Sequence, residues 1–247
     1  MTPVQHIAFG FACLLIGLSK GGLGGPLPVS MVIPMLSLVM DPREAVPLTT
    51  PYLIFADWFA LRAYWRKWDT EQVRLLLPMA IVGVIIGGLT LSIIPENALI
   101  LVIAVATLIV IIYKLASDRF EALEYEPRTW HGYLAGWASG FTSTLANAGA
   151  FPFTIYMLLQ KKLSSVAFIG TVTLFFAIIN LLKIPIFIQQ DLLSTDSLLS
   201  VIWALPIIPF GVWLGRKSLD YISQQTFQRV MMGLLILTVF LLFGNLL

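Results

Sequence analysis

Long apolar runs, separated by short charged or Gly/Pro-rich breaks, occupy almost all of this 247-residue chain. The breaks divide it into five apolar segments in each half. The first half holds 4–18, 25–40, 46–65, 73–93 and 97–116, and the second half holds 131–145, 150–160, 166–188, 198–215 and 226–246. A helix that crosses a bilayer needs roughly 20 mostly apolar residues. The pattern therefore predicts an all-α polytopic membrane protein that is surrounded by the lipid bilayer.

Each half begins with a pair of segments that are too short to cross a bilayer comfortably. Breaks rich in small residues, 19–28 and 142–152, separate the two members of each pair. Clusters of Gly and Pro of this kind interrupt helices. The longest polar stretch, 117–130, is predicted to be a cytoplasmic linker between a first transmembrane repeat, 1–116, and a second, 131–247.

Composition supports the membrane prediction and excludes several other classes. The chain is 58% hydrophobic and 11% charged, whereas soluble globular proteins are about 45–50% apolar and about 25% charged. A formal net charge of +2 provides no basic surface for nucleic acid. The sequence has one cysteine, Cys13, which excludes a disulfide framework and a cysteine-based metal cluster. We therefore expect no metal site, no cofactor and no nucleic-acid partner.

Matching prolines and glycines indicate that the two halves are repeats. A Pro-x4-Gly-x3-Gly pattern occurs twice at an offset of 128 positions, as Pro78, Gly83 and Gly87 and then as Pro206, Gly211 and Gly215. The order of short and long segments is also the same in both halves. Glycines spaced four apart permit close packing of membrane helices. We expect these glycines to pack helices together, either between the repeats or in a homodimer.

The distribution of basic residues predicts that the repeats are inverted. With the loop after segment 46–65 in the cytoplasm, twelve of the fifteen basic residues fall on that side. They are Arg62, Arg66, Lys67, Arg74, Lys114, Arg119, Arg128, Lys161, Lys162, Arg216, Lys217 and Arg229. The positive-inside rule favours this orientation, which places both termini outside, in the periplasm of a bacterial inner membrane. Each half then crosses the membrane an odd number of times, so the halves face opposite ways, as in many secondary transporters.

The two breaks are the predicted substrate site. Inverted-repeat transporters bind substrate near the midplane, where broken helices of both halves meet, and helix N-termini favour anions there. Lys20 adds a positive charge, glycines allow close approach, and hydroxyl and amide side chains add hydrogen bonds. The candidate residues are Ser19, Lys20, Gly21, Gly22, Gly24, Gly25, Thr142, Ser143, Thr144 and Asn147. The alternative is that the glycines only pack helices and that Lys20 lies at a cytoplasmic helix end.

Asp57 is the carboxylate that falls well inside a long predicted span. Ionisable residues in such positions face the interior of the helix bundle and often serve function. Asp57 is therefore a candidate proton-coupling residue, and a structural hydrogen-bonding role is the alternative. Its counterpart 123 positions later is Asn180, which lies beside Lys183.

Two runs of the sequence resemble a known transporter family. The run 17–25 resembles the opening of the sulfite exporter TauE/SafE family, also called toluene sulfonate uptake permeases, and the run 136–150 resembles its repeated motif. The resemblance extends over essentially the whole chain. It implies transport of sulfur-containing anions, such as sulfite or organosulfonates, across the bacterial inner membrane.

The leading hypothesis is a secondary transporter of small sulfur-containing anions that works by alternating access, with its midplane site between the two breaks. The alternatives are a passive anion channel that uses the same breaks as a filter, or a transporter of another small anion such as a carboxylate. An intramembrane enzyme is not expected, because Asp57 has no catalytic partner at a recognisable spacing.

Overall fold

The fold is a bundle of helices. The computed structural model describes residues 1–22, 27–121, 128–159, 164–218, 221 and 223–246, and these residues contain eleven α-helices and one 3-10 helix. Six helical stretches are long and apolar enough to cross a membrane: Pro3–Lys20, Thr70–Ile93, Glu96–Leu115, Val166–Gln189, Thr195–Ser218 and Gln225–Gly244. The prediction of an all-α polytopic membrane protein is confirmed.

The first half contains a long helix, a short helix and then three long helices. They are α1 (Pro3–Lys20), α2 (Leu27–Leu36), α3 (Pro42–Ala63), α4 (Thr70–Ile93) and α5 (Glu96–Glu121). Two of these helices have carboxylate caps at their N-termini, since Asp41 accepts a hydrogen bond from Arg43 N and Asp69 accepts from Glu71 N. Helix α5 extends beyond the expected end at residue 116, so the first residues of the predicted linker are helical.

The second half begins in the same way but differs at its fourth segment. It comprises α6 (Thr129–Ala146), α7 (Ala150–Leu158), α8 (Ser165–Gln189), α9 (Thr195–Val201), η1 (Ile202–Ala204), α10 (Ile207–Ser218) and α11 (Gln224–Leu246). The predicted segment 198–215 lies within the apolar stretch Thr195–Ser218, but its helix is interrupted, because α9 ends at Val201 and α10 begins only after Pro206. Proline lacks an N–H donor and its ring clashes with the preceding turn of a helix.

The helix pairs at the start of the halves are less uniform than predicted. Helices α1 and α6 each have 18 residues, a length of about 27 Å that nearly matches the hydrocarbon thickness of about 30 Å. Helices α2 and α7 have 10 and 9 residues and reach about half that depth. Each pair therefore consists of a nearly full-length helix and a half-length helix, joined at the predicted break.

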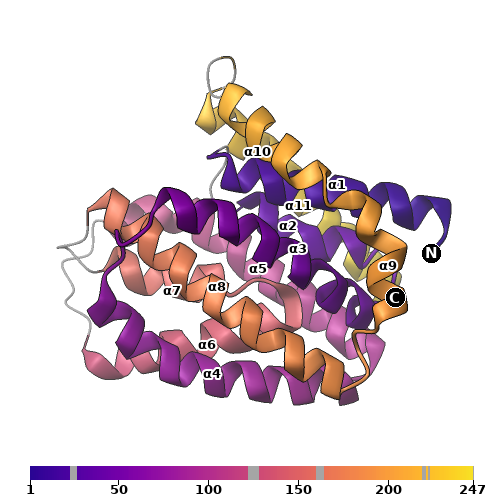
Figure 1. The fold of residues 1–247 in the computed structure, drawn as a ribbon, viewed down its shortest axis with the longest axis horizontal. Coiled ribbons are helices and arrows are strands. Elements are labelled where there is room, and N and C mark those ends of the chain that lie inside the picture. The colour runs from indigo at the N-terminus through magenta and orange to yellow at the C-terminus, as the bar shows by residue number, and fades with distance from the viewer. Residues whose placement is uncertain (23–26, 122–127, 160–163, 219–220, 222, 247) are drawn as a thin grey trace.

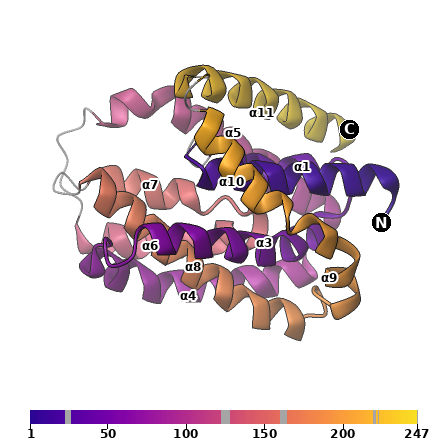
Figure 2. The ribbon, with the colours of Figure 1, turned by 45° about the horizontal axis from the view of Figure 1, so that its top comes forward.

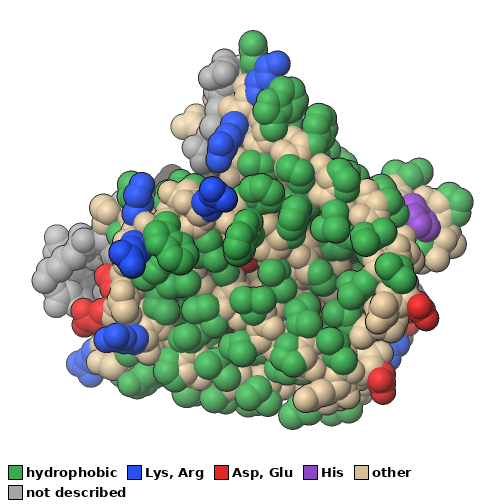
Figure 3. Space-filling model, viewed as in Figure 1, with side chains coloured by type: hydrophobic (Ala, Val, Ile, Leu, Met, Phe, Trp, Pro, Cys, Tyr) green, Lys and Arg blue, Asp and Glu red, His purple; other side chains and the backbone are tan. Residues whose placement is uncertain are grey.

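The exterior of the bundle is apolar in the way that a bilayer requires. Large hydrophobic side chains such as Ile93, Ile7 and Phe240 are more than 70% exposed. On the face drawn in Figure 3, hydrophobic side chains dominate the centre, whereas Lys and Arg gather at the left edge and at the top. Exposed apolar area on this scale marks an interaction surface, and with six apolar helices that surface is the one that contacts lipid.

The glycine-rich faces join helices of different halves. A Cβ atom on Gly83 would lie 2.3 Å from the carbonyl oxygen of Trp137, so α4 packs directly on α6. Gly17 and Gly21 of α1 pack in the same manner against Gly211 and Gly215 of α10. The predicted packing role of the glycines is therefore confirmed, and their faces are occupied by contacts within the chain rather than left free for a second copy.

Both ends of the chain lie at the same end of the bundle (Figures 1 and 2). Helix α1 begins at this end and α6 begins at the opposite end. Helices α3 and α8 also run in opposite directions to each other (Figure 1). The C-terminal ends of α1 and α6 thus approach the centre of the bundle from opposite ends, where Lys20 of α1 contacts α3 and Ser143 of α6 contacts α8.

Candidate functional site

A cavity of about 310 Å³ lies between the two breaks and helices α3 and α8. Its polar lining comprises Ser19, Lys20, Ser30, Asp57, Tyr64, Ser143, Asn147, Thr154, Thr173 and Asn180. Its apolar lining includes Leu53, Val172 and Phe176. A cavity of this size, with a few convergent polar groups in an apolar wall, is typical of a small-molecule site.

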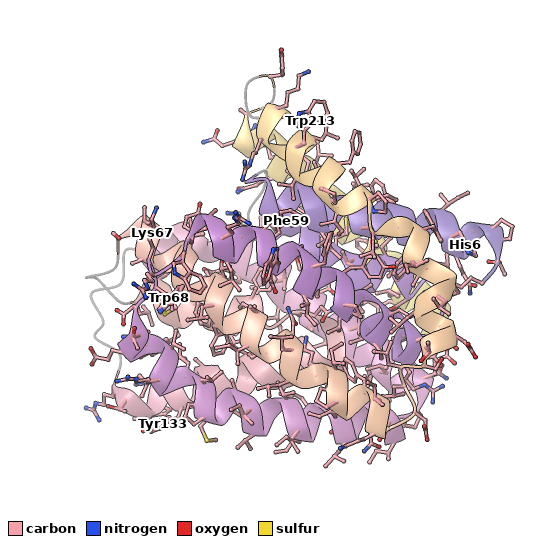
Figure 4. The ribbon with its side chains drawn as sticks, viewed as in Figure 1. His6, Phe59, Lys67, Trp68, Tyr133 and Trp213 are labelled. Carbon is pink, nitrogen blue, oxygen red and sulfur yellow. The ribbon has the colours of Figure 1, made fainter. Side chains whose placement is uncertain are left out.

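The cavity extends toward one end of the bundle. Tyr64 at the end of α3 and Phe168 near the start of α8 both line it, and Gly170 of α8 packs against the backbone of Lys67. Figure 4 places Lys67 and Trp68 at this end and His6 at the other. Toward the His6 end, the buried Tyr52 donates a hydrogen bond to the carbonyl of Val201 and packs edge-on against Phe9.

An ion pair between Lys20 and Asp57 forms the charged part of the lining. The Lys20 Nζ lies 2.5 Å from Asp57 Oδ1, and the two side chains are 19% and 2% exposed. Lys20 is the last residue of α1, where the unpaired carbonyls of a helix end also favour a cation. Asp57 lies in the C-terminal third of α3. The structure thus brings together the two charged residues that the sequence identified separately.

The second carboxylate oxygen of Asp57 connects this ion pair to α8. Asn180 Nδ2 donates a hydrogen bond to Asp57 Oδ2 at 2.9 Å, and Asn180 Oδ1 accepts one from Lys183 Nζ at 3.0 Å. The side chain of Asn180 therefore lies between a carboxylate and a second ammonium group. Because an amide donates at one end and accepts at the other, Asn180 is oriented by the charges on both sides.

Lys183 is completely buried and is held by three oxygen atoms. Its Nζ donates to the carbonyl of Ser143 at 2.8 Å, to Asn147 Oδ1 at 3.1 Å and to Asn180 Oδ1 at 3.0 Å. An ammonium group has three N–H donors and no acceptor, whereas a neutral amine has only two donors. Three acceptors around Nζ therefore match the charged form of Lys183.

Asn147 terminates α6 and joins that helix to α3. It has a left-handed backbone conformation with φ of 50°, which Asn adopts more readily than most residues. Its Nδ2 donates to Thr49 Oγ1 at 3.1 Å while its Oδ1 accepts from Lys183. The second break therefore holds Lys183 through a backbone carbonyl and a neutral side chain.

The other predicted site residues divide between the cavity and the helix contacts. Ser19 and Gly22 line the cavity, and Gly22 has a positive φ of 98°. Gly21 instead packs against α10, where an added Cβ would lie 2.5 Å from the carbonyl of Val212. Thr142 and Thr144 donate hydrogen bonds to carbonyls one turn earlier in α6 and do not line the cavity. Gly24 and Gly25 lie outside the described residues.

Sequence reasoning left two important residues, Lys183 and Thr49, out of the site. Thr49 has no charge and donates its own hydroxyl to helix carbonyls of α3, so its pattern is that of an ordinary helical threonine. Lys183 follows Asn180 by one helical turn, and Asn180 is the counterpart of Asp57 at the repeat offset. That offset was the available signal, because counterparts in a repeat occupy matching positions in the fold.

Helices that cross a membrane around a buried, charged and partly open cavity define a multi-pass membrane transport protein. The chain belongs to the sulfite exporter TauE/SafE family, whose family model matches residues 9–242. This match confirms the resemblance that the runs 17–25 and 136–150 indicated. The members of this family are membrane transporters and not enzymes. Comparison with curated proteins and with solved structures gave no match.

Proposed function

We propose that the protein is a secondary transporter of small sulfur-containing anions, either organosulfonates or sulfite, and that the cavity between the two breaks binds the anion. The observation that carries this proposal is Lys20, a cation on the cavity wall in a chain of the sulfite exporter family. The start of α7 adds to it, because Ala150 lines the cavity and the N-terminus of a helix carries a partial positive charge that favours an anion.

Transport would proceed by alternating access between two inverted repeats, 1–116 and 131–247. The helix contacts support this, because α1 packs on α10 as α6 packs on α4, while α3 packs on α8 and α5 packs on α11. When each helix is exchanged for its counterpart in the other half, this set of contacts is reproduced. A two-fold relation of this kind is expected for inverted repeats whose halves rock around a fixed site.

The orientation follows from the charges at the two ends of the bundle. We infer that the end with Lys67 faces the cytoplasm of a bacterial cell and that both termini face the periplasm. The Lys and Arg side chains at one edge of Figure 3 support this orientation through the positive-inside rule. This conformation would then be open to the cytoplasm, since the cavity extends toward the Lys67 end.

Reconstitution of the purified protein into liposomes tests the proposed function. We expect saturable flux of sulfite or of an organosulfonate under an imposed gradient, and we expect Lys20→Gln to abolish it. Arg43→Gln is the matched control, because Arg43 is also paired with an aspartate but lies at a helix start away from the cavity. A panel that includes sulfate and acetate identifies a different anion, and flux that does not saturate would indicate a channel.

A further inference from the structure

The charges beside the cavity do not balance. Lys20 and Lys183 contribute two positive charges, and Asp57 contributes one negative charge when it is ionised. Asp57 is paired directly with Lys20 and reaches Lys183 only through Asn180, and the three atoms that hold Lys183 are neutral oxygens. The described cluster therefore carries a net charge of +1 inside the protein.

An unbalanced charge inside a membrane protein is unfavourable unless another charge compensates it. The groups that face Asp57 from the helices packed on α3 are Lys20 of α1 and Lys183 of α8. Helix α2 has no titratable residue, and the described charged residues of α5 and α10, such as Glu96 and Arg216, lie toward the ends of those helices. Tyr64 is the other titratable group of the cavity wall. On this charge count, a bound anion would supply the missing negative charge.

We infer that anion valence determines whether Asp57 carries a proton. A monovalent anion neutralises the cluster while Asp57 is ionised. A divalent anion neutralises it only when Asp57 is protonated, because protonation raises the net charge of the cluster to +2. A proton on Asp57 also removes its attraction for Lys20, and the ammonium group is then free to turn toward the anion. This inference rests on the proposed function, since it concerns the same cavity.

Sulfite exists as both a monovalent and a divalent ion near neutral pH, and the cluster can neutralise either form. The divalent ion with a proton on Asp57 has the same total charge as the monovalent ion with Asp57 ionised. The two forms differ only in whether the proton lies on the anion or on the Asp57 carboxylate. The site would therefore bind one anion and one net negative charge in either form.

Calorimetric titration of the full-length protein in detergent, with sulfate and with methanesulfonate, tests the inference. Sulfate remains divalent and methanesulfonate monovalent from mildly acidic to mildly alkaline pH. We expect sulfate to bind about tenfold more tightly for each unit by which the pH falls, since one proton enters with each anion. Methanesulfonate affinity should be independent of pH. Equal pH dependence of the two anions would overturn the inference.

Two variants change the charge of the cluster in opposite directions. Asp57→Asn fixes the cluster at +2, so sulfate should bind more tightly than methanesulfonate and its pH dependence should disappear. Lys183→Met removes one positive charge, so methanesulfonate should now bind more tightly as the pH falls. Arg43→Met is the control and should leave both pH profiles as in the wild type. Wild-type pH profiles in Asp57→Asn or in Lys183→Met would contradict the inference.

Flux measurements on the same proteins separate this inference from the proposed function. If liposomes with the wild-type protein move none of the tested anions, the proposed function fails and the inference fails with it. If they move both sulfate and methanesulfonate with the same pH dependence, the proposed function stands and only the inference fails.

Discussion

The two helix breaks occupy equivalent places in the two halves but contribute different chemistry. The first break places Lys20 on the cavity wall, where it pairs with Asp57 of α3. The residue 123 positions later is Ser143, and it presents a backbone carbonyl to Lys183 of α8. The cation of the first half thus comes from the break itself, whereas the cation of the second half comes from the helix that faces the break.

The two cations differ in whether a ligand in the cavity can reach them. The Lys20 side chain is 19% exposed, whereas Lys183 has no exposed surface. Lys20 is paired with a carboxylate, whose charge a proton can remove. The atoms that hold Lys183 are uncharged oxygens, so protonation does not change their charge. Matching positions in the two halves thus hold one partly exposed cation and one fully buried cation.

The largest expected effect comes from removing the carboxylate on which the first break depends. Asp57→Ala leaves Lys20 and Lys183 near each other without a counter-ion. Breaking a buried pair in this way costs about 3 kcal/mol or more of unfolding free energy. Asn147→Ala in the second break removes the hydrogen bonds of an uncharged side chain to Lys183 and Thr49 and adds backbone strain, but it leaves no charge without its counter-ion and should cost less. Denaturant-induced unfolding in detergent measures both values.

Asp41→Ala is the control for this prediction. Asp41 pairs with Arg43 at 2.6 Å, a separation similar to that of the buried pair, but the two side chains are 23% and 36% exposed. Exposed pairs contribute about 0–1 kcal/mol, and loss of the Asp41 cap of α3 adds about 1 kcal/mol, so the total stays below the cost of Asp57→Ala. If Asp41→Ala destabilised the protein as much as Asp57→Ala, the difference between the breaks would not arise from a buried charge.

A second prediction concerns the glycines that precede the two breaks. A Cβ on Gly140 of α6 would lie 2.0 Å from the carbonyl oxygen of Ala80, and a Cβ on its counterpart Gly17 of α1 would lie 2.6 Å from that of Ile208. Both contacts require a shift of backbone. We expect Gly140→Ala to cost about 3 kcal/mol and Gly17→Ala about 2 kcal/mol, measured by unfolding in detergent.

Gly233→Ala in α11 provides the matched control, because no atom lies within 4 Å of the added Cβ. Alanine also has the higher helix propensity, so this variant should be neutral or slightly stabilised. Equal losses for Gly17→Ala and Gly140→Ala would remove the distinction between the two packing faces. If Gly233→Ala lowered the unfolding free energy by a similar amount, the losses in the other two variants would not arise from their close contacts.

The features that could be predicted from the sequence are those that depend on local pattern or on charge. Apolar runs were sufficient for the all-helical membrane fold, and the small-residue runs for the two breaks. Lys20 was identified as the charged residue of the first break, and Asp57 as an ionisable residue well inside a long span. Their ion pair was not predicted, because it joins residues 37 positions apart that only the packing of α1 on α3 brings together.

Helical periodicity explains why some of the predicted site residues line the cavity and others do not. Ser143 and Asn147 are four residues apart, so they lie on the same face of α6, and both line the cavity. Thr142 and Thr144 lie on either side of that face and donate to their own helix. The break at Pro206 could not be predicted from proline alone, because its counterpart Pro78 lies inside the uninterrupted α4.

The smallest expected effect distinguishes the side chain of Asn147 from its backbone. Asn147→Gly and Asn147→Ala both lose the hydrogen bonds to Lys183 and Thr49, but only glycine adopts a positive φ without strain. Asn147→Ala should therefore be less stable than Asn147→Gly by about 1 kcal/mol. Gly22→Ala should show a similar cost in the first break, where φ is 98°. If unfolding gives equal stabilities for the two Asn147 variants, the second break depends on the polar side chain and not on the turn, and the two breaks then differ in backbone requirement as well as in charge.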